Sequence, residues 1–519
     1  MAADFPPPAF DVAFVGSGLS ATYTTIRFLE RLLAGGRRQR SVALATVERA
    51  EEFHTGIPYG SRSGTNALLI TSLKDFIPSP ERELFTDWLT ANRHWMFEPF
   101  LESGGALSKA WYDTNAAAIE EGRWLDLYIP RYLFGLFLTD RVGALLSEAK
   151  RRVIVTHEYV QAEVCSLDRS NGRYCLQLAT GASLQARLVV LALGMPVPLS
   201  QFSHLSSDVT DAACFVDDPY LPNVQVHIER MREHLLRGDT SATVLLIGAN
   251  ASTMEMLFRL NDDAEIDGLV KKYVVLSPKG ALPERLVDPD PSVRFVAHHL
   301  EALPASPALT AKAVYDAARS DIEAGTAQQL TISDTLTPIF QAMGCVVKLL
   351  SREEKLEFAG VWGSDLGRFQ RRAGTEYSDL VETLRASGRL EIVAARFHAV
   401  GSVTPTGVCI EQTNGANDAA VEHPTPMAVI VNCSGSGSLN EAGAAGIVES
   451  LVEGGLVQVN KSARGLVLDD DMQANHNLFV VGPLMSGNVI ADVPVWHMEH
   501  CGRIIFYGGA LADHLLARL

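Results

Sequence analysis

The stretch Asp11-Val-Ala-Phe-Val-Gly16-Ser-Gly18-Leu-Ser20-Ala21 of this 519-residue chain decides how the rest of the sequence is interpreted. It places the pattern Gly-x-Gly-x-x-Ala directly after an apolar run of strand length and at the start of a segment with helical spacing. In such a unit the first glycine permits a tight turn, the second lets the backbone approach a pyrophosphate, and the alanine allows close helix–strand packing. The helix N-terminus adds amide donors for the phosphates. We therefore predict that a dinucleotide site is lined by Gly16, Ser17, Gly18, Ser20 and Ala21.

The next apolar run, residues 41–47, ends at Glu48. In dinucleotide-binding folds this position faces the adenosine ribose, where a carboxylate can accept hydrogen bonds from the hydroxyls. The alternative is a structural glycine turn with a solvent-facing glutamate. Because the glycine motif and the carboxylate occur together, we favour a nucleotide site with Glu48 as its ribose contact.

Apolar runs that end in glycine recur along the chain. They are residues 11–15 before Gly16, 188–193 before Gly194, 243–247 before Gly248 and 478–481 before Gly482, and a further run at 429–433 precedes Ser434-Gly-Ser-Gly437. Doubly wound α/β folds bind ligands beyond the carboxyl ends of their parallel strands, where such glycines lie. The pattern predicts an α/β fold with two Rossmann-like dinucleotide-binding domains, and it adds Gly194 and Gly482 to the candidate cofactor contacts.

The run before Gly248 opens a second candidate site, Gly248-Ala-Asn250-Ala251-Ser252. Asn250 replaces the second glycine of the motif, and asparagine tolerates the left-handed conformation that such a turn can need. The third small position of the motif is Ala251 or Ser252. We predict that Gly248, Asn250, Ala251 and Ser252 contact a nicotinamide dinucleotide, although this motif is less specific than the first.

The strand expected at residues 272–276 leads into Ser277 and Lys279, with no carboxylate for a ribose. The Ser277 hydroxyl or the Lys279 ammonium can instead bind a 2′-phosphate, so we predict NADPH rather than NADH as the second cofactor. A solvated loop lysine is the alternative interpretation of Lys279, and Arg285 is a second candidate for the phosphate.

Composition argues against several classes of partner. The chain has 44 Lys and Arg against 61 Asp and Glu, a net charge of −17, which disfavours nucleic acid and anionic membrane surfaces. It has no apolar run of 18 residues and no signal-like N-terminus, so we expect a cytoplasmic protein with no membrane partner. The seven cysteines include no Cys-x-x-Cys pair, which argues against disulfides, a zinc ribbon or a dithiol relay. We predict an enzyme that acts on a small-molecule substrate without a metal, and the sequence leaves a homo-oligomer open.

Four further segments carry a family resemblance: Thr55-Gly-Ile-Pro-Tyr-Gly60, Asn66-Ala-Leu-Leu-Ile-Thr71, Phe85-Thr-Asp-Trp-Leu89 and Pro130-Arg-Tyr-Leu-Phe-Gly135. With the N-terminal motif they resemble the FAD/NAD(P)-binding family called YdhS-like, and more widely the class B flavoprotein monooxygenases, including the N-hydroxylating ones. The resemblance implies FAD and NADPH as cofactors, flavin contacts through Gly56 and Tyr59, and a cofactor-binding role for Arg131. The family's Leu-Leu-Asn order is not kept here, because Asn66 precedes the leucines.

The C-terminal segment follows the same resemblance. In flavoproteins of this plan the glycine after the last strand lies beside the ribityl chain, and the amides that start the last helix face the flavin O2/N1 edge. Such donors stabilise the negative charge of reduced flavin. The resemblance thus implies flavin contacts at Gly482, Asn488 and Val489.

The last helix is expected to begin near Asp492, as its N-cap, with Pro494 in the first turn. His497 and His500 would then lie three apart on one helical face. With no third ligand at matching spacing, they are interpreted as a packed or surface pair rather than a metal site.

We predict an FAD-binding domain made of residues 1–235 and 426–519, with an NAD(P)-binding domain inserted at 236–425. Within the insertion, residues from about 283 to 388 have little strand character and are expected to form helices, either a cap over the substrate or a packing layer. Residues 402–426 are expected to form a hairpin or loop, with a strand at 408–411.

The resemblance implies a monooxygenase in which reduced flavin and molecular oxygen form a C4a-hydroperoxide that attacks the substrate. No Phe-x-Gly-x-x-x-His-x-x-x-Trp/Phe/Tyr segment lies between the two nucleotide motifs, and Asn432-Cys-Ser-Gly435 replaces the Ala-Thr-Gly-Tyr of N-hydroxylases. Baeyer–Villiger oxidation is therefore disfavoured, and we predict hydroxylation of a heteroatom, with an amine as the first candidate. The alternatives are an NAD(P)H-dependent reductase or electron carrier without oxygen insertion, or a flavin-binding protein with no turnover. The sequence nominates no catalytic residue.

Overall fold

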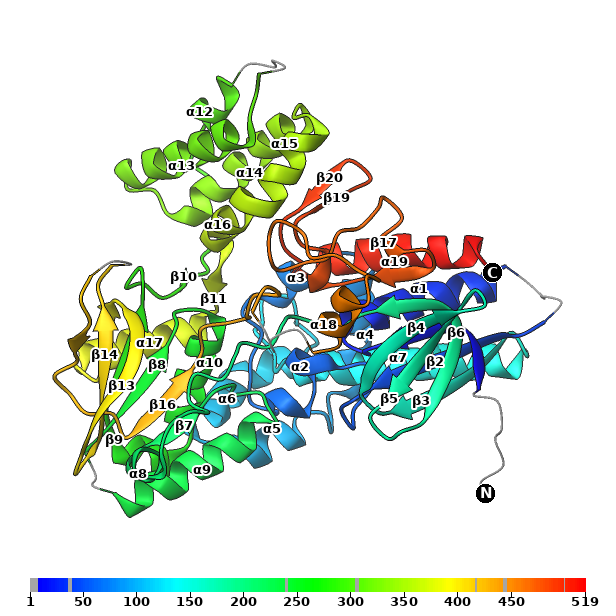
Figure 1. The fold of residues 1–519 in the computed structure, drawn as a ribbon. Coiled ribbons are helices and arrows are strands. Elements are labelled where there is room, and N and C mark those ends of the chain that lie inside the picture. The colour runs from blue at the N-terminus through cyan, green and yellow to red at the C-terminus, as the bar shows by residue number, and fades with distance from the viewer. Residues whose placement is uncertain are drawn as a thin grey trace.

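The computed structural model describes residues 8–35, 40–238, 241–303, 308–415, 418–441, 446–498 and 500–519. Figure 1 shows three parts: a first sheet with its helices, a second sheet with its helices, and a smaller helical unit above the junction between them. The predicted α/β fold with two Rossmann-like domains and a helical insertion is confirmed. No helix within these ranges has both the length and the apolar character needed to cross a membrane.

The first sheet has the order β17-β18-β6-β1-β2-β3, and β4 and β5 extend it from β6 as an antiparallel meander. Strands β18, β6, β1, β2 and β3 run parallel. The bounds are β1 (Ala9–Val15), β2 (Val42–Glu48), β3 (Val155–Gln161), β4 (Val164–Ser170), β5 (Arg173–Leu178), β6 (Ser183–Leu191), β17 (Gln473–Asn475) and β18 (Leu478–Val480). All of β1 after Ala9 is buried, as expected for a strand that is covered on both faces.

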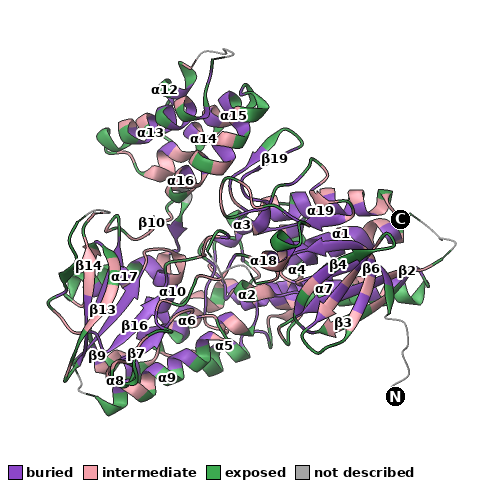
Figure 2. Ribbon diagram, viewed as in Figure 1, coloured by how far each residue is buried: buried purple, intermediate pink, exposed green. Residues whose placement is uncertain are grey.

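Helix α1 (Leu19–Ala34) packs against α7 (Tyr132–Arg151) and α19 (Cys501–Ala517), so both ends of the chain contribute to the first domain. A Cβ atom on Gly508 would lie 3.1 Å from the Thr24 amide nitrogen, so this glycine lets α19 approach α1 closely. Shorter helices complete the domain: α2 (Gly56–Tyr59), η1 (Ser61–Ser63), α3 (Leu73–Phe76), α4 (Glu81–Asn92), α5 (Glu98–Ser103), α6 (Ala106–Glu120) and α18 (Ile447–Glu453). Figure 2 shows the buried residues concentrated along these packed elements and the two sheets.

The second sheet is parallel, with the order β12-β9-β8-β16-β7. Its strands are β7 (Cys214–Val216), β8 (Ala242–Ile247), β9 (Val270–Ser277), β12 (Leu390–Ala394) and β16 (Val429–Asn432). Its helices are α8 (Ser207–Ala212), α9 (Val224–Arg237), α10 (Ala251–Asp262), α11 (Ala264–Leu269) and α17 (Thr375–Ala386). The antiparallel strands β13 (Arg396–Thr404), β14 (Gly407–Thr413) and β15 (Val421–Glu422) flank it, so the predicted hairpin and its strand at 408–411 are confirmed.

The predicted domain boundaries differ from this pairing. β7 and β16 lie outside residues 236–425, yet they pair with each other, and β16 pairs with β8. Both are short apolar segments, and pairing with strands far away in the sequence determines which sheet they join. The second sheet therefore begins before residue 235 and ends after residue 426.

The helical unit forms its own apolar core. It contains α12 (His298–Glu301), α13 (Ala311–Ala327), α14 (Ile332–Lys348), α15 (Arg352–Glu357), the π-helical turn η2 (Phe358–Trp362), α16 (Gly363–Gly367) and η3 (Arg368–Gln370). The parallel pair β10 (Glu284–Arg285) and β11 (Arg372–Ala373) connects it to the second domain. The expected helices at 283–388 are present, but α17 packs against α10 and so belongs to the second sheet's domain.

The segment before α19 corrects a prediction. Asp492 is not a helix cap, because residues 488–495 form a hairpin of β19 (Asn488–Ile490) and β20 (Val493–Val495), preceded by η4 (Pro483–Met485). Ala491 and Asp492 make the turn with φ of 47° and 66°, and Pro494 lies in β20. The helix begins at Cys501 with His500 as its N-cap, so His497 and His500 do not share a helical face. β-Branched residues in this segment favour strands, which outweighs the capping pattern.

Candidate nucleotide-binding sites

The first glycine turn is closed by contacts that only glycine permits. Gly16 has φ +90°, and its amide donates to the Val47 carbonyl at 2.8 Å. A Cβ atom at Gly16 would lie 2.3 Å from the Ala192 carbonyl oxygen, which leaves no room for a side chain. Gly18 is the N-cap of α1 and offers no side-chain cap. The first-turn amides of α1 therefore remain available to a phosphate.

Two other predicted contacts lie against this turn. A Cβ atom at Gly56 would be 3.0 Å from the Gly18 Cα, and one at Gly482 would be 2.9 Å from the Ser20 hydroxyl oxygen. Gly56 and Gly482 have φ of +60° and +96°, so both positions favour glycine. The structure thus brings Gly18, Ser20, Gly56 and Gly482 together, although they come from three distant stretches of sequence.

Glu48 at the end of β2 is held by Ser17. Its Oε2 accepts hydrogen bonds from the Ser17 amide at 2.8 Å and from the Ser17 hydroxyl at 3.1 Å, and its Oε1 accepts one from the Ala50 amide at 3.0 Å. Ser17 Oγ also accepts the His54 amide at 3.2 Å. The carboxylate is 8% exposed and fixed in place, so Oε1 keeps the remaining capacity to accept a ribose hydroxyl.

A cavity of about 590 Å³ opens beside this carboxylate. Its lining includes Arg49 and Glu52 after β2, Gly56 beside the glycine turn, Arg62, and Gln161 at the end of β3. It therefore extends from Gly56, beside the glycine turn, to the carboxyl ends of β2 and β3. Doubly wound folds bind their ligands at this edge of the sheet.

The predicted flavin residue Tyr59 lies in an aromatic group. Its ring is 6.0 Å from Phe76 and 5.1 Å from Phe134 between centroids, and its hydroxyl is 3.5 Å from the Cys501 sulfur. Burial raises the pKa of the Tyr59 hydroxyl well above its usual value. Tyr59 thus links α2 to the first residue of α19.

The contacts predicted at Asn488 and Val489 rested on a helix start that lies elsewhere. The buried Asn488 amide accepts from the Leu468 amide and donates to the carbonyls of Leu466 and Met485, so it is engaged by the backbone. Val489 is buried in β19. The amides that start the last helix belong instead to Cys501 and Gly502.

Sequence reasoning missed His500, Cys501 and Gly502. The signal was a polar residue directly before the apolar-periodic run, since the His500 ring nitrogen Nδ1 accepts the Gly502 amide at 3.1 Å. Aspartate is a more common N-cap than histidine, so the helix start was predicted at Asp492.

Arg131 is engaged between the domains. Its guanidinium lies 2.8 Å from the Glu255 carboxylate of α10 and 6.0 Å from the centre of the Tyr220 ring. Burial alone would lower the pKa of Arg131, but the Glu255 carboxylate raises it above its usual value. The structure therefore gives Arg131 a partner in the second domain.

The second glycine turn repeats the first. Gly248 has φ +106°, its amide donates to the Leu276 carbonyl at 2.8 Å, and a Cβ atom would lie 2.5 Å from the Cys433 carbonyl oxygen. Asn250, however, is not left-handed, because its φ is −135°. Its side chain caps α10 and bridges to Cys433, which explains an asparagine at this position.

The Asn250 cap uses both ends of the amide group. Oδ1 accepts the amides of Ser252 at 2.9 Å and Thr253 at 3.3 Å, and Nδ2 donates to the Cys433 carbonyl at 2.7 Å. Counting from Gly248, Thr253 occupies the place of Ala21, and it is fully buried. The third small position is therefore Thr253, and Ala251 and Ser252 form the first turn of α10.

The residues predicted to read a 2′-phosphate are placed differently from one another. Ser277 ends β9, is 5% exposed, and its hydroxyl accepts the Gly280 amide at 3.2 Å. Lys279 Nζ lies 3.7 Å from the Asp365 carboxylate and 5.6 Å from the centre of the Phe369 ring, so it contacts the helical unit. Arg285 pairs with Asp379.

Gly194, after β6, is an open position: it has φ +78°, and a Cβ atom there would meet nothing within 4 Å. Its place at the carboxyl end of the first sheet agrees with its predicted exposure to a ligand. Its positive φ favours glycine at this position.

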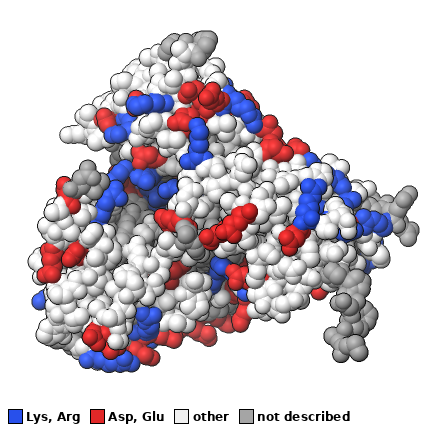
Figure 3. Space-filling view, in the orientation of Figure 1, with Lys and Arg blue, Asp and Glu red and all other residues white. Residues whose placement is uncertain are grey.

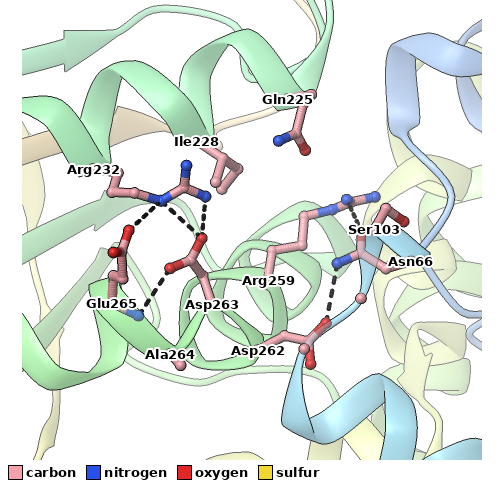
Figure 4. Close-up of a pocket in the computed structure, with 12 residues that line it drawn as sticks. Asn66, Ser103, Gln225, Ile228, Arg232, Arg259, Asp262, Asp263, Ala264 and Glu265 are labelled. Atoms are coloured by element: carbon pink, nitrogen blue, oxygen red, sulfur yellow. Dashed lines mark hydrogen bonds and ion pairs between the residues drawn. The ribbon is translucent and has the colours of Figure 1, made fainter. Parts of the chain in front are cut away.

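A polar cavity of about 270 Å³ lies between the domains, and Figure 4 shows its lining. Asn66 donates to Asp262 at 3.2 Å and contacts Arg259, which in turn pairs with Glu255 at 3.1 Å. On the other side Arg232 pairs with Asp263. These groups bind one another, so they connect the two domains. Asn66 takes part in this connection through Asp262 and Arg259.

Comparison with known proteins places the chain in a family. Residues 13–196 match a family model described as FAD-NAD(P)-binding. The uncharacterized proteins Rv3403c of Mycobacterium tuberculosis and Mb3437c of Mycobacterium bovis are each 31% identical over 519 residues, which covers 99% of this chain and 96% of theirs. The chain belongs to the family of these mycobacterial proteins. The chain also shows a weaker match to the uncharacterized protein YdhS of Escherichia coli, 23% identical over 186 residues, covering 35% of this chain and 30% of YdhS.

Solved structures share the fold of this Rv3403c family member. L-lysine 6-monooxygenase from Pseudomonas syringae matches with a TM-score of 0.54 and 14% identity, covering 98% of this chain and all of that one. An ornithine N-hydroxylase from Kutzneria sp. 744 matches with a TM-score of 0.53 and 14% identity, with the same coverage. The predicted resemblance to FAD/NAD(P)-binding proteins and to N-hydroxylating monooxygenases is thereby confirmed at the level of fold.

FAD fits the first site of the Rv3403c family member. A Cβ atom on Gly16 would fill the turn, Glu48 stands at the end of β2, and the cavity of about 590 Å³ is lined by Arg49 and by Gly56, which lies against Gly18. NAD(P) fits the second turn in its glycine and strand geometry, whereas Asn250 covers amides that a phosphate would use. The two sites are thus built on one plan and differ in how open they are.

Proposed function

We propose that this protein is an FAD-dependent, NADPH-using monooxygenase that hydroxylates a heteroatom, with a small amine as the first substrate class. The observation that carries the proposal is the pair of equivalent glycine turns at Gly16 and Gly248, each at the carboxyl edge of its own parallel sheet. Two dinucleotide sites on one chain are the arrangement needed to pass a hydride from a nicotinamide to a flavin. When bound, the flavin supplies the redox chemistry with oxygen.

The chain's own residues hold and orient the cofactors. Glu48, fixed by Ser17, binds the adenosine ribose, and the open first turn of α1 binds the pyrophosphate. The start of α19 at Cys501 and Gly502 supports the flavin ring, with Tyr59 packed against it. Positive ends of helix dipoles favour the anionic form of a ligand there.

The helical unit is proposed as the substrate cap. It docks on the β20 end through Gly363, where a Cβ atom would lie 2.6 Å from the Trp496 side chain, and through the pair of Lys355 and Asp492 at 2.7 Å. Excluding water protects an oxygenating flavin from wasteful peroxide release. A cap anchored beside the start of α19 can supply that exclusion.

The structural neighbours support an amine substrate. They are a lysine 6-monooxygenase, an ornithine N-hydroxylase with reduced FAD, NADP⁺ and L-ornithine, and an FAD-bound cadaverine monooxygenase from Erwinia amylovora. The described chain also has no vicinal cysteine pair to relay electrons to a thiol. Oxygen is then the acceptor at hand.

The test is incubation of the FAD-loaded protein with NADPH and ¹⁸O₂ across a panel of amines, thiols and ketones. We expect one labelled oxygen atom in an amine product, with peroxide release lower than NADPH consumption. If no label enters any product, and a quinone or carrier protein accepts electrons far faster than oxygen, the protein is a reductase instead.

A further inference from the structure

The inference concerns Arg372, a buried guanidinium without an acidic partner. Arg372 opens β11 and is 7% exposed. Its Nη1 donates to the Arg371 carbonyl at 2.7 Å, but Nε and Nη2 have no hydrogen-bond partner. Within the described ranges no carboxylate lies within ion-pair distance of it.

Other buried arginines show what Arg372 lacks. Arg131 and Arg259 both pair with Glu255, and Arg141 pairs with Glu81. An arginine removed from water is normally paired, because an unpaired charge loses its hydration without compensation. Arg372 lacks the carboxylate partner that these three arginines have.

The charge of Arg372 is retained despite burial. Burial lowers the pKa of the guanidinium, while Glu284, directly opposite on β10, acts to raise it. A guanidinium titrates so far above neutrality that it stays protonated in the protein. The side chain therefore presents two unused donors and a full positive charge.

Lys and Arg side chains gather in the hollow below the helical unit, beside the second domain (Figure 3). Asp365 and Asp379 are engaged by Lys279 and Arg285. Glu284 is exposed, so it is well hydrated and balances the buried charge only weakly.

We propose that Arg372 is an anion-binding residue that receives a phosphate or carboxylate group of a ligand lying between the helical unit and the second nucleotide domain. The planar guanidinium suits both groups, since two donors on one edge match two oxygens. Two sources supply this chemistry: the 2′-phosphate of NADPH, or a carboxylate on the substrate. The choice of these two ligands rests on the proposed function. Under this proposal Arg372, at the base of the helical unit, replaces Lys279 as the main residue that binds the anionic group.

The test compares Arg372→Met and Arg372→Lys with Arg389→Met, a control in the same domain whose arginine is paired with Asp267 at 2.8 Å. Isothermal titration on the FAD-loaded proteins uses NADP⁺ and NAD⁺ in one arm, and L-lysine and cadaverine, which differ by one carboxylate, in the other. We expect Arg372→Met to weaken binding of either NADP⁺ or L-lysine about ten- to a hundredfold, and to leave unchanged the binding of the partner compound that lacks the 2′-phosphate or the carboxylate. Loss for NADP⁺ alone identifies the 2′-phosphate, and loss for L-lysine alone identifies a substrate carboxylate.

A stability measurement separates this role from a structural one. Because the buried charge is unpaired, Arg372→Met should leave the melting temperature of the ligand-free protein unchanged or raise it, and the bound FAD should stay stoichiometric. A fall of several degrees, or unaltered binding of all four probes, overturns the proposal. Neither result depends on oxygen insertion, so the inference can fail while the proposed function stands.

Discussion

The two glycine turns share a scaffold and differ in one residue that decides how a phosphate is received. At the first turn Gly18 caps α1 without a side chain, and at the second Asn250 covers the amides of Ser252 and Thr253 with its own oxygen. A pyrophosphate at the first turn meets free donors. At the second it must displace the Asn250 side chain, which lowers the net gain of binding.

The ribose positions differ in the same direction. The first ends in the fixed Glu48 carboxylate, and the second ends in Ser277. A cofactor that stays bound through many turnovers needs the first kind of site, and one that must leave after each turnover needs the second. From this comparison we expect the protein to bind FAD more tightly than the nicotinamide cofactor.

The largest expected effect is loss of FAD from Gly18→Val. The branched side chain would occupy the path of the phosphates at the open turn. The purified variant should lack the flavin absorbance of the wild-type protein. Gly143→Ala, at a glycine whose Cβ would meet nothing within 4 Å, is the control and should remain yellow. Stoichiometric FAD in Gly18→Val would show that the first glycine turn does not bind the FAD phosphates.

Acid should release FAD from the first site through His54. Burial lowers the pKa of His54 to about 4, and its amide binds the Ser17 hydroxyl. Between pH 6.5 and 4 the unfolded chain therefore binds a proton that the folded protein does not, so stability falls as the pH falls. The full shift corresponds to roughly 3 kcal/mol.

This pH dependence is measured by the fluorescence of released FAD. His54→Asn should flatten the profile, because asparagine tolerates the φ of +72° at this position. His204→Asn, an exposed position, should not. Identical profiles for wild type and His54→Asn would show that another group controls acid release.

Replacement of the ribose carboxylate should weaken FAD without abolishing it. Glu48→Gln keeps the shape but loses the charge-assisted bonds, so the dissociation constant should rise about ten- to a hundredfold. Titration of FAD into the apoprotein measures it, with the exposed Glu158→Gln as control. An unchanged constant would mean that the cavity beside β2 does not hold the adenosine ribose.

Two substitutions of Asn250 should change NADPH binding in opposite directions. Asn250→Gly should tighten NADPH binding several-fold, because the amides of α10 become free, with only a few tenths of a kcal/mol lost from the helix cap. Asn250→Asp adds a like charge and should raise the NADPH requirement and peroxide leakage. If both variants weaken NADPH equally, the asparagine contacts the nucleotide instead of covering its site.

The smallest expected effect is that of Lys279→Ala. Its side chain is 62% exposed and already faces Asp365, so its contribution to a 2′-phosphate is screened. The ratio of the Michaelis constants for NADPH and NADH should change about twofold to threefold. A tenfold change would show that Lys279 binds the 2′-phosphate, as predicted from the sequence.

Local sequence was sufficient for the glycine turns. A strand followed by glycine and a helix is encoded within about fifteen residues, so the turns at Gly16, Gly248 and Gly482 could be predicted. The partners that close them are distant: the Asn250 amide bonds to Cys433, which lies 183 positions away. The sequence alone does not distinguish an asparagine that caps a helix from one with a left-handed backbone. The position of the Cys433 carbonyl shows that Asn250 is a cap.

The same distance explains why the sequence did not show which sheet β7 and β16 join, or that Arg131 contacts the second domain. β7 and β16 carry apolar residues that suit either sheet, and only their pairing decides which one they join. Arg131 and Asn66 suit a flavin site until Glu255 and Asp262 approach from the second domain. Sequence therefore identified the glycine turns but not the contacts between the domains.

The attachment of the helical unit has an evolutionary consequence. Its two connections enter and leave as adjacent strands, with Glu284 beside Arg372 and Arg285 beside Ala373, so its ends are close together. A segment with neighbouring ends and its own core can be exchanged as a module, because neither nucleotide sheet is interrupted by its removal. Relatives can thus acquire new specificities by recombination at this ladder, while the machinery for electron delivery is inherited unchanged.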